Sequence, residues 1–475
     1  MCKVYDDSVD FIYTYQCFTV FSYEDGVEKR AIFRNQNRLM FMIHFMAYMG
    51  MYFKIQETKI LVFYAAQVVM LSAIILLYTK IYRKASRLII NNMCMLLTIG
   101  FIMITRLSYN KAVKQSMIVA VSVAISLFIP VIIRKVKGLA ELRLFYAIVG
   151  IVALAAVIVV GTVSGGAKLG FEIAGFGIHP SEFVKILFVF FVAASFNRSI
   201  AFRDVVITTA IAAAHVLILV VSKDLGAALI IFVVYLVMIY VATRQILYAG
   251  AGILAGAGAS VVAYQLFNHV RVRVEIWKDP FATYSTGGYQ IAQAMFAIGT
   301  GGWFGTGLFQ GEADSIPVAD EDFIFAAISE EMGLIFALCM ILICLSCYVM
   351  FLNIAMKLEN RFYKLVALGL GTCYIFQTFL TIGGVTKFIP MTGVTLPLVS
   401  YGGSSVLSTL IMFAIIQGLY IFKEDEEEEF ERQQLLQEER ARRARENRER
   451  RNRHHLIELE RRTEEKAPVR RTKKK

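Results

Sequence analysis

The sequence predicts an all-α protein that crosses a membrane many times. Hydrophobic residues make up 57% of its 475 residues and charged residues only 18%, and the mean hydropathy is +0.60. A soluble protein has about 25% charged residues, so a water-facing globule of this composition could not bury its apolar surface. The second observation is a series of twelve apolar runs, most of them near the roughly 20 residues that a spanning helix needs. Together they exclude a disordered chain, a secreted disulfide scaffold and an ordinary soluble enzyme.

The twelve runs follow one another over most of the chain. Those at 39–55 and 183–197 are the shortest. Residues 11–22 are also apolar but too short to span, which is typical of an interfacial helix or the stump of a longer helix. The predicted spans are 39–55, 59–79, 89–107, 115–133, 144–164, 183–197, 204–221, 224–242, 246–267, 323–353, 362–385 and 403–422.

The distribution of Lys and Arg predicts the orientation of the helices. With the C-terminal tail in the cytoplasm, the cytoplasmic loops carry more Lys and Arg than the external loops, although the external loops are longer. This is the positive-inside pattern, and it explains the net charge of +12 better than nucleic-acid binding does. Both termini are then expected inside. The start, MCKVYDDSVD, is polar and acidic, so we expect no cleavable signal peptide.

Two external segments interrupt the pattern of short loops. Residues 268–322 form a predicted external loop that is rich in Gly, aromatic residues and carboxylates, which indicates an ordered, functional loop. Residues 386–403 (TKFIPMTGVTLPLVSYGG) are too apolar for a solvated loop. Irregular backbone is tolerated at membrane depth only under protein or water, so we expect this segment to be re-entrant or packed on the bundle.

The chain is expected to divide into three parts. Residues 1–88 form an N-terminal segment with about two extra transmembrane helices, residues 89–422 form a ten-helix core, and residues 423–475 form a charged cytoplasmic tail. The tail is either a solvated helix with i,i+4 pairs or disordered. It serves either to solubilise the chain or to dock a cytoplasmic partner or anionic lipid.

Cysteine and histidine spacing gives no sign of a metal or disulfide site. The seven cysteines lie mostly within apolar runs and form no paired CxxC motifs, and the histidines lack ligand spacing. We expect no structural metal.

Charged residues at or inside the apolar runs are candidates for function, because charge is costly in a membrane. Glu182 and Lys185 lie three residues apart at the start of one run, so they share a helix face and can pair. Asp224 begins another helix, where an acid also favours the helix dipole. Glu330 and Glu331 are adjacent and point about 100° apart, so at most one of them faces a given cavity. Structural pairing and a polar cavity remain alternatives for both.

The external loop holds a second set of charges. A carboxylate there could deprotonate a sugar hydroxyl, and Lys, Arg or a bound divalent cation could stabilise a departing pyrophosphate. Most loop acids are simply solvated, and spacing alone does not choose among them. The charged residues of interest are Arg271, Arg273, Glu275, Asp279, Glu312, Asp314, Asp320, Glu321 and Asp322.

Four blocks of sequence, in order, carry a resemblance to a known family. They are IHPSEFVK (178–185), KDLGAAL (223–229), GGYQIAQAMFAIGTGGWFGTGLFQG continuing into IPVADEDFIFAAISEEMGLIFAL (287–338), and KFIPMTGVTLPLVSYGGSS (387–405). Together they resemble the SEDS family (shape, elongation, division and sporulation), which includes FtsW, RodA and SpoVE. The resemblance covers about residues 90–422, and it leaves out the first two helices and the tail.

The resemblance implies a peptidoglycan glycosyltransferase of the bacterial cytoplasmic membrane, with a SEDS-like ten-helix core. Such proteins polymerise lipid II, an undecaprenyl-pyrophosphate-linked disaccharide peptide, at the outer face of the membrane during division, elongation or sporulation. They work with a class B penicillin-binding protein. The β-1,4 product and the α-linked donor imply inversion, which needs a base on the acceptor 4-hydroxyl and positive charge at the pyrophosphate.

The resemblance also implies site residues. The family loop commonly reads RVxxxx(N/D)PxxDPxGxGYQ, and its second acid is the proposed catalytic Asp. Aligned without gaps from Tyr289, Arg273 and Asp279 match the family's Arg and first acid, but the place of the second acid is Thr283. We therefore predict Asp279 as the catalytic base and Arg273 as a substrate-binding residue. Another acid, or a catalytically weakened chain, remains an alternative.

Further predicted residues complete the site. Lys387 adds a charge where the family usually has Gly, and it either touches a phosphate or snorkels at the interface. Other residues fall on matching motif positions and are expected to bind substrate or line a cavity open to the outer leaflet. They are Glu182, Lys185, Asp224, Asp322, Glu330, Ser400, Ser404 and Ser405.

Two other functions compete with the polymerase. A flippase for lipid-linked precursors needs a polar path that opens to each face in turn, whereas the motifs concentrate at the external side. A non-catalytic scaffold that recruits a penicillin-binding protein is favoured by Thr283 and by the long tail.

Overall fold

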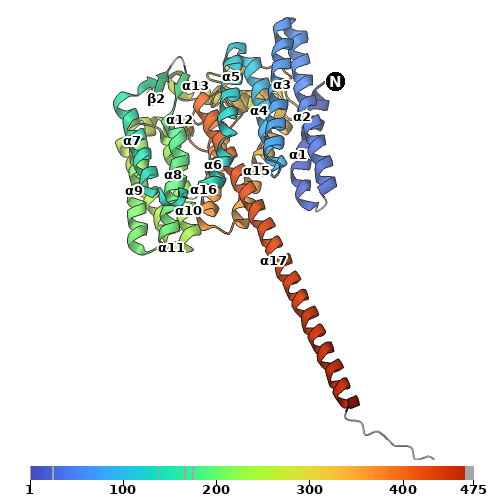
Figure 1. Cartoon of the computed structure of the whole chain (residues 1–475). Helices are drawn as coiled ribbons and strands as arrows, with labels where there is room; N and C mark the ends of the chain where they lie inside the picture. Colours follow the sequence, from blue (N-terminus) through green and yellow to red (C-terminus); the bar gives the residue numbers. More distant parts are fainter. Residues whose placement is uncertain (1, 24–25, 137, 165–166, 174–175, 466–475) are drawn as a thin grey trace, which may run out of the picture. The chain divides into compact units, whose positions relative to one another are not determined.

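The computed structural model describes residues 2–23, 26–136, 138–164, 167–173 and 176–465, and most of them are helical (Figure 1). Among these residues, ten helices are long and apolar enough to cross a membrane. The predicted all-α polytopic fold is therefore confirmed. The other two predicted runs lie in α2 (Gly26–Ile55), whose first half is rich in basic residues, and in α7 (Arg143–Val160), which is short.

Three helices begin the chain. α1 (Cys2–Thr19) is followed by a 3₁₀ turn (Val20–Ser22), by α2 and by α3 (Thr58–Ile81). α1 contains most of the short apolar run at 11–22, and it packs against α2 and α15 (Gly333–Lys357). The Tyr13 hydroxyl donates to Oδ1 of Asn92 at 3.1 Å, so a polar group of α1 is satisfied inside the bundle. That residues 1–88 add two spanning helices stays a prediction.

The next helices form the centre of the bundle. α4 (Arg87–Leu107) is buried over nearly its whole length. α5 (Tyr109–Ser126) and α6 (Ile129–Lys135) share one predicted run, and a 3₁₀ turn (Leu139–Glu141) leads into α7. Pro130 stands at the start of α6, where its missing N–H leaves no helical hydrogen bond unmade.

A small antiparallel sheet follows α7, and it was not predicted. β1 (Thr162–Ser164), β2 (Ala167–Ile173) and β3 (Phe176–Ile178) pair in that order, with Phe171 opposite Ile178. The predicted run at 144–164 is therefore wrong at its end, because the helix stops at Val160 and the Gly-rich stretch turns into strands. Gly170 is required there, since a Cβ would lie 2.1 Å from the Ile178 oxygen.

Four helices form one half of the bundle. They are α8 (Pro180–Arg198), α9 (Phe202–Val221), α10 (Leu225–Thr243) and α11 (Ile246–Leu266). α7, α8 and α9 lie side by side (Figure 1), and α10 packs on both α8 and α9. α8 and α10 bury much of their length, whereas no residue of α11 is buried. The polar start of α8 thus reaches the interior through Lys185, whereas Asp224 at the start of α10 is half-buried.

The long loop at 268–322 is ordered and largely helical. It holds α12 (Asn268–Lys278), a π turn (Tyr284–Gly288), α13 (Tyr289–Gly301) and a 3₁₀ turn (Ala313–Ser315). The predicted single span at 323–353 is corrected, because α14 (Ile324–Glu331) and α15 are separate helices that meet at Met332. The break arises at Gly333, whose φ of +91° and close approach to the backbone of Gly305 exclude a side chain.

The last part of the chain contains α16 (Arg361–Val385), an irregular segment at 386–402 and α17 (Gly403–Glu465). The irregular segment is packed on the bundle, with Val394, Leu396, Leu398 and Val399 buried. The chain forms two compact units, Met1–Ile421 and Phe422–Lys475, and α17 belongs to both. Within the second unit the described tail is helical and carries the predicted i,i+4 pairs, such as Arg442 with Glu446.

Candidate active site

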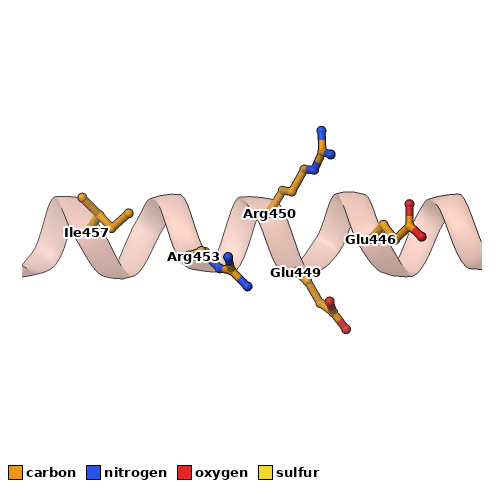
Figure 2. A pocket seen from close by; sticks show the side chains of 5 residues that line it. All are labelled: Glu446, Glu449, Arg450, Arg453 and Ile457. Atoms are coloured by element: carbon orange, nitrogen blue, oxygen red, sulfur yellow. The ribbon is translucent and has the colours of Figure 1, made fainter.

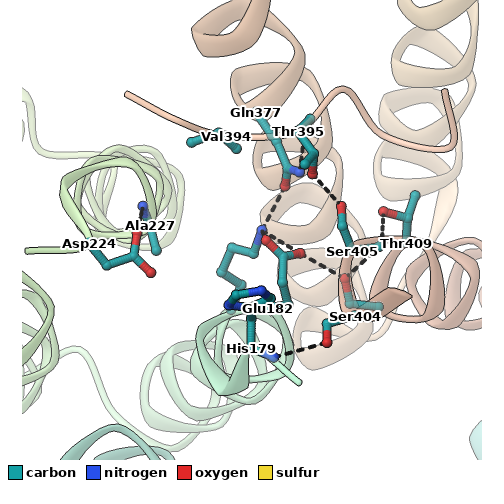
Figure 3. Close-up of polar contacts among 12 residues, drawn as sticks. His179, Glu182, Asp224, Ala227, Gln377, Val394, Thr395, Ser404, Ser405 and Thr409 are labelled. Atoms are coloured by element: carbon teal, nitrogen blue, oxygen red, sulfur yellow. Dashed lines mark hydrogen bonds and ion pairs between the residues drawn. The ribbon is translucent and has the colours of Figure 1, made fainter. Parts of the chain in front are cut away.

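The start of α8 carries a buried cluster of charged and polar side chains (Figure 3). Lys185 Nζ lies 3.0 Å from both carboxylate oxygens of Glu182, which confirms the predicted pairing. The same ammonium group donates to Oε1 of Gln377 on α16 at 2.6 Å. The Ser408 hydroxyl on α17 donates to Oε2 of Glu182 at 2.9 Å. Three helices therefore meet at one ion pair.

The irregular segment is fastened beside this cluster through its main-chain oxygens. Nε2 of Gln377 donates to the Thr395 oxygen at 3.0 Å, and the Thr381 hydroxyl donates to the Val394 oxygen at 2.9 Å. The Thr395 hydroxyl donates to the Ser405 hydroxyl at 2.7 Å (Figure 3). Because Gln377 contacts both Lys185 and the segment, it couples the position of the ion pair to that of the segment.

Ser404 connects the start of α17 to the small sheet. Its hydroxyl accepts a hydrogen bond from the His179 N–H at 2.9 Å and donates to the Gly177 oxygen at 3.1 Å. Ser404 and Ser405 are both buried. Their hydroxyls are thus held by protein groups, and they join the start of α17 to the sheet and to the irregular segment.

A second group of charges surrounds the middle of the irregular segment. Nη1 of Arg273, on α12, donates to the main-chain oxygens of Met391 at 3.3 Å and Thr392 at 3.1 Å. Burial lowers the pKa of Arg273, and the nearby carboxylates of Asp224 and Asp322 oppose that change. The structure thus brings together three residues that lie far apart in the sequence and were each predicted to belong to the site.

Asp224 reaches this group from the N-terminus of α10. Its Oδ1 accepts the Ala227 N–H at 3.0 Å, so it caps the helix as the dipole argument predicted. The first turn of α10 is pressed against the irregular segment, because a Cβ at Gly226 would lie 2.2 Å from Cγ2 of Val394. The cap therefore sets the position of an acid beside Arg273.

Asp322 reaches the same group from the end of the long loop. The Tyr401 N–H donates to the main-chain oxygen of Asp320 at 2.7 Å, and the Ser400 hydroxyl donates to the main-chain oxygen of Glu321. These two bonds fix the main chain that leads to Asp322. Burial raises the pKa of Asp322 to about 7, and the adjacent acids add to the rise. Its carboxyl group therefore titrates near neutral pH.

Asp279, the predicted base, lies outside both groups. It ends α12 with an exposed side chain, and its Oδ1 accepts the N–H groups of Phe281 and Ala282 at 3.0 Å each. The carboxylate therefore closes the turn that follows the helix.

Lys387 and Glu330 make hydrogen bonds outside the two groups of charges. Lys387 has a φ of +60°, and its main-chain oxygen accepts the indole N–H of Trp277 at 3.1 Å. Glu330 is buried, and its Oε1 accepts the Glu312 N–H at 2.9 Å. These contacts join the irregular segment to α12 and α14 to the end of the long loop.

The structure adds a buried arginine that was not predicted. Arg106 Nε donates to Oε1 of Glu331 at 2.8 Å, and its Nη1 lies 2.8 Å from Oδ2 of Asp314. Lys111 is a similar addition, with Nζ 2.6 Å from Oδ2 of Asp320. A signal existed for Arg106, because it is a charge at the end of an apolar run. The two cations attach the end of the long loop to α4 and α5.

The tail offers no comparable site among its described residues. A pocket in the tail is lined by Glu446, Glu449, Arg450, Arg453 and Ile457, and Figure 2 shows that all five project from one helix. All five side chains are exposed. Across the described parts of the chain, no group of three or more His, Cys, Asp or Glu residues is placed to hold a metal ion.

An all-α bundle with buried charges around an irregular segment defines a polytopic membrane protein with a polar site among its helices. The chain belongs to the FtsW/RodA/SpoVE family, since the model of that family, described as a cell cycle protein, matches residues 86–424. This confirms the predicted family. The chain is accordingly a multi-pass protein of the bacterial inner membrane.

Named relatives agree with this assignment. The peptidoglycan glycosyltransferase RodA of Mycobacterium leprae is 35% identical over 344 residues, which cover 67% of this chain and 74% of that protein. RodA of Mycobacterium tuberculosis is 39% identical over 267 residues, or 53% of this chain and 57% of that protein. A probable peptidoglycan glycosyltransferase FtsW of Bacillus subtilis is 32% identical over 323 residues, or 62% and 78%.

Solved structures share the fold. A chain of a peptidoglycan synthase complex that coordinates polymerization and crosslinking superposes with a TM-score of 0.61 at 21% identity, covering 71% of this chain and 97% of that one. RodA of Thermus thermophilus superposes with a TM-score of 0.52 at 21% identity, covering 71% and 96%. At this identity the likeness establishes the fold alone.

Proposed function

We propose that this chain is an inverting peptidoglycan glycosyltransferase that polymerises lipid II into β-1,4-linked glycan strands at the outer face of the membrane. Family membership and the names of the relatives support the activity. The observation that carries the proposal is the group of Arg273, Asp224 and Asp322 around the irregular segment. It places a cation and carboxylates together, as transfer from a pyrophosphate donor requires.

The chemistry assigns a role to each kind of group. A carboxylate takes the proton of the acceptor 4-hydroxyl while the oxygen of that hydroxyl attacks the anomeric carbon of the donor. The bond from that carbon to the phosphate oxygen breaks, and the lipid pyrophosphate leaves with its electron pair. Arg273 is the proposed partner of that anion, with Lys387 as a second cation at the external mouth. Two carboxylates compete for the role of base: Asp279, predicted from the sequence, and Asp322.

The other predicted residues support the site. The ion pair of Glu182 with Lys185 would form the inner wall of the proposed cavity, together with Ser404 and Ser405. Asp224, Glu330 and Ser400 position the loop and helix ends around it. We propose these as cavity-lining and positioning residues.

A partner and an orientation complete the proposal. A class B penicillin-binding protein would crosslink the strands that this chain makes, as the likeness to a chain of a peptidoglycan synthase complex suggests. The tail would lie in the cytoplasm, in agreement with the excess of Lys and Arg in the loops on that side.

The test is polymerisation of labelled lipid II by the purified full-length protein, with and without a class B penicillin-binding protein. Glycan ladders are expected from the wild type, and Arg273→Ala should reduce them at least tenfold. No ladders, even with the partner and under conditions where a known relative is active, would favour the scaffold. That alternative keeps its support in Thr283, which stands where the family has its catalytic acid.

A further inference from the structure

The position that resembles the family's catalytic acid has no acid in this chain. Thr283 stands there, and its hydroxyl donates to the main-chain oxygen of Asp279 at 2.9 Å. A hydroxyl group with a pKa far above neutral cannot accept a proton as a carboxylate does. The base must therefore be another residue if the chain is a polymerase.

Asp279 is poorly placed to replace it. One of its carboxylate oxygens accepts two N–H groups of the turn that it closes, and its side chain is exposed. These two hydrogen bonds hold that oxygen against the turn, away from the group of Arg273, Asp224 and Asp322 in their contacts. Asp279 therefore has a structural task at the end of α12.

Asp322 differs from Asp279 in its burial and in its contacts. It is half-buried, and it lies beside Arg273 and the irregular segment, where a Cβ at Gly393 would stand 3.9 Å from its Oδ2. Its two predecessors carry the structural contacts: Asp320 pairs with Lys111 at 2.6 Å, and the main-chain oxygen of Glu321 accepts the Ser400 hydroxyl. The main chain is thus held on one side, while the carboxyl group lies against the irregular segment whose main-chain oxygens accept hydrogen bonds from Arg273.

We propose that Asp322 is the catalytic base of this chain, in place of the acid that Thr283 replaces. This rests on the proposed polymerase function. Asp322 accepts the proton of the acceptor 4-hydroxyl, the new bond forms from that oxygen to the anomeric carbon, and the bond to the phosphate oxygen breaks. Arg273, within electrostatic reach of Asp322, offsets the charge of the departing pyrophosphate.

The surroundings of Asp322 suit a base at neutral pH. Burial raises its pKa to about 7, Glu321 and Asp320 add to the rise, and Arg273 opposes it. Further charged groups lie nearby among the described residues: Asp224 and His269 lie near Arg273, and Lys223 lies near His269. Lys111 on α5 faces the acids that precede Asp322, and His179 lies near Glu321. A base is most effective when its pKa lies near the working pH.

The test compares amide variants of three acids in the lipid II polymerisation assay. Asp322→Asn should lower the rate by about 10²- to 10⁴-fold, the range for loss of a general base, with labelled lipid II binding within about threefold of wild type. Asp279→Asn tests the rival base, and its rate should exceed that of Asp322→Asn at least tenfold. Glu275→Gln, an exposed acid on α12, is the matched control with an unchanged rate.

Two further readouts separate a base from a structural residue. The wild-type rate should rise with pH with a midpoint near 7, and the residual rate of Asp322→Asn should lack that midpoint. Asp322→Glu should recover at least tenfold over Asp322→Asn, because it restores a carboxylate. An Asp322→Asn rate within threefold of wild type, or a greater loss in Asp279→Asn, would overturn the assignment. A wild type without ladders would overturn the proposed function and this assignment with it.

Discussion

Lys185 and Glu182 form a buried ion pair one turn apart on α8, with Nζ 3.0 Å from each carboxylate oxygen. The Lys185 side chain is 1% exposed and that of Glu182 14%. Gln377 and Ser408 supply further hydrogen bonds to the pair. Each charge is thus compensated by the other, and loss of either one leaves an unpaired charge within the bundle.

The ion pair predicts an asymmetric effect of single and double substitution. Lys185→Met should lower the free energy of unfolding by about 3–5 kcal/mol, the typical cost of an orphaned buried charge. Lys185→Met combined with Glu182→Gln should recover most of that loss. Thermal unfolding of the purified variants in detergent measures both. A double variant as unstable as the single one would contradict the pairing as the main source of the effect.

Arg106 predicts a second effect, on the end of the long loop. Arg106→Met removes the partner of Glu331 and Asp314, so residues 302–322 should open more often. Limited proteolysis should then cleave this stretch at least tenfold faster than in the wild type. Asp314→Asn is the control. The Asp314 side chain is 68% exposed, so this substitution should lower the free energy of unfolding by at most about 1 kcal/mol. Equal protection in Arg106→Met and wild type would contradict the role of Arg106 as an anchor.

The N-terminus of α10 allows the cap to be separated from the charge. Asp224→Ala removes the acceptor of the Ala227 N–H, and it should lower the free energy of unfolding by about 1 kcal/mol. Asp224→Asn keeps an oxygen there, and Asn caps as well as Asp, so it should remain within about 0.5 kcal/mol of wild type. Chemical denaturation in mixed micelles compares the two. An Asn variant as unstable as the Ala variant would mean that the charge beside Arg273 is the stabilising feature.

The sequence predicts those parts of the fold that depend on local pattern. Helices form over most of each of the twelve apolar runs, because a lipid environment leaves helices as the main solution for long apolar segments. The pairing of Glu182 with Lys185 and the cap at Asp224 follow from spacing and position along a helix. The sheet at 162–178 and the break at Met332 depend on glycines whose conformations are set by distant backbone.

The members of the candidate site could be named one by one from the sequence, but their assembly could not. Motif positions identified Arg273, Asp224 and Asp322 separately, whereas their meeting depends on how the irregular segment folds between α10 and α12. Gln377 carried no signal beyond an amide in an apolar run, yet it joins Lys185 to Thr395. Long-range contacts of this kind arise from packing, which a single sequence does not reveal.

The glycine at the start of α15 predicts a large effect of one methyl group. Gly333 has a φ of +91°, and a Cβ there would lie 2.4 Å from the Gly305 nitrogen. Gly333→Ala should therefore lower the free energy of unfolding by several kcal/mol, since strain and a clash with backbone add. Gly299 is the matched control, because a Cβ at that position would meet nothing within 4 Å. Gly299→Ala on α13 should be neutral or stabilising by about 1 kcal/mol, and thermal unfolding that ranks the two variants alike would contradict the account.

Asp322 predicts how stability depends on pH. Its pKa is about 7 in the folded protein and 3.8 without the fold. Between these values the folded state keeps a proton that the unfolded state has lost. The free energy of unfolding therefore falls as pH rises through this window. Asp322→Asn removes this contribution, because an amide does not titrate.

The free energy of unfolding of the wild type, minus that of Asp322→Asn, should accordingly fall from about pH 4 to about pH 7 and then level off, as the linkage requires. Melting temperatures measured at half-unit pH steps in one detergent follow this difference directly. Thr283→Val, a change without a titrating group in the same loop, should run parallel to the wild type. A difference that stays flat, or rises with pH, would show that the carboxyl group is not held neutral by its surroundings. It would also remove the electrostatic reason for Asp322 to act as a base near neutral pH.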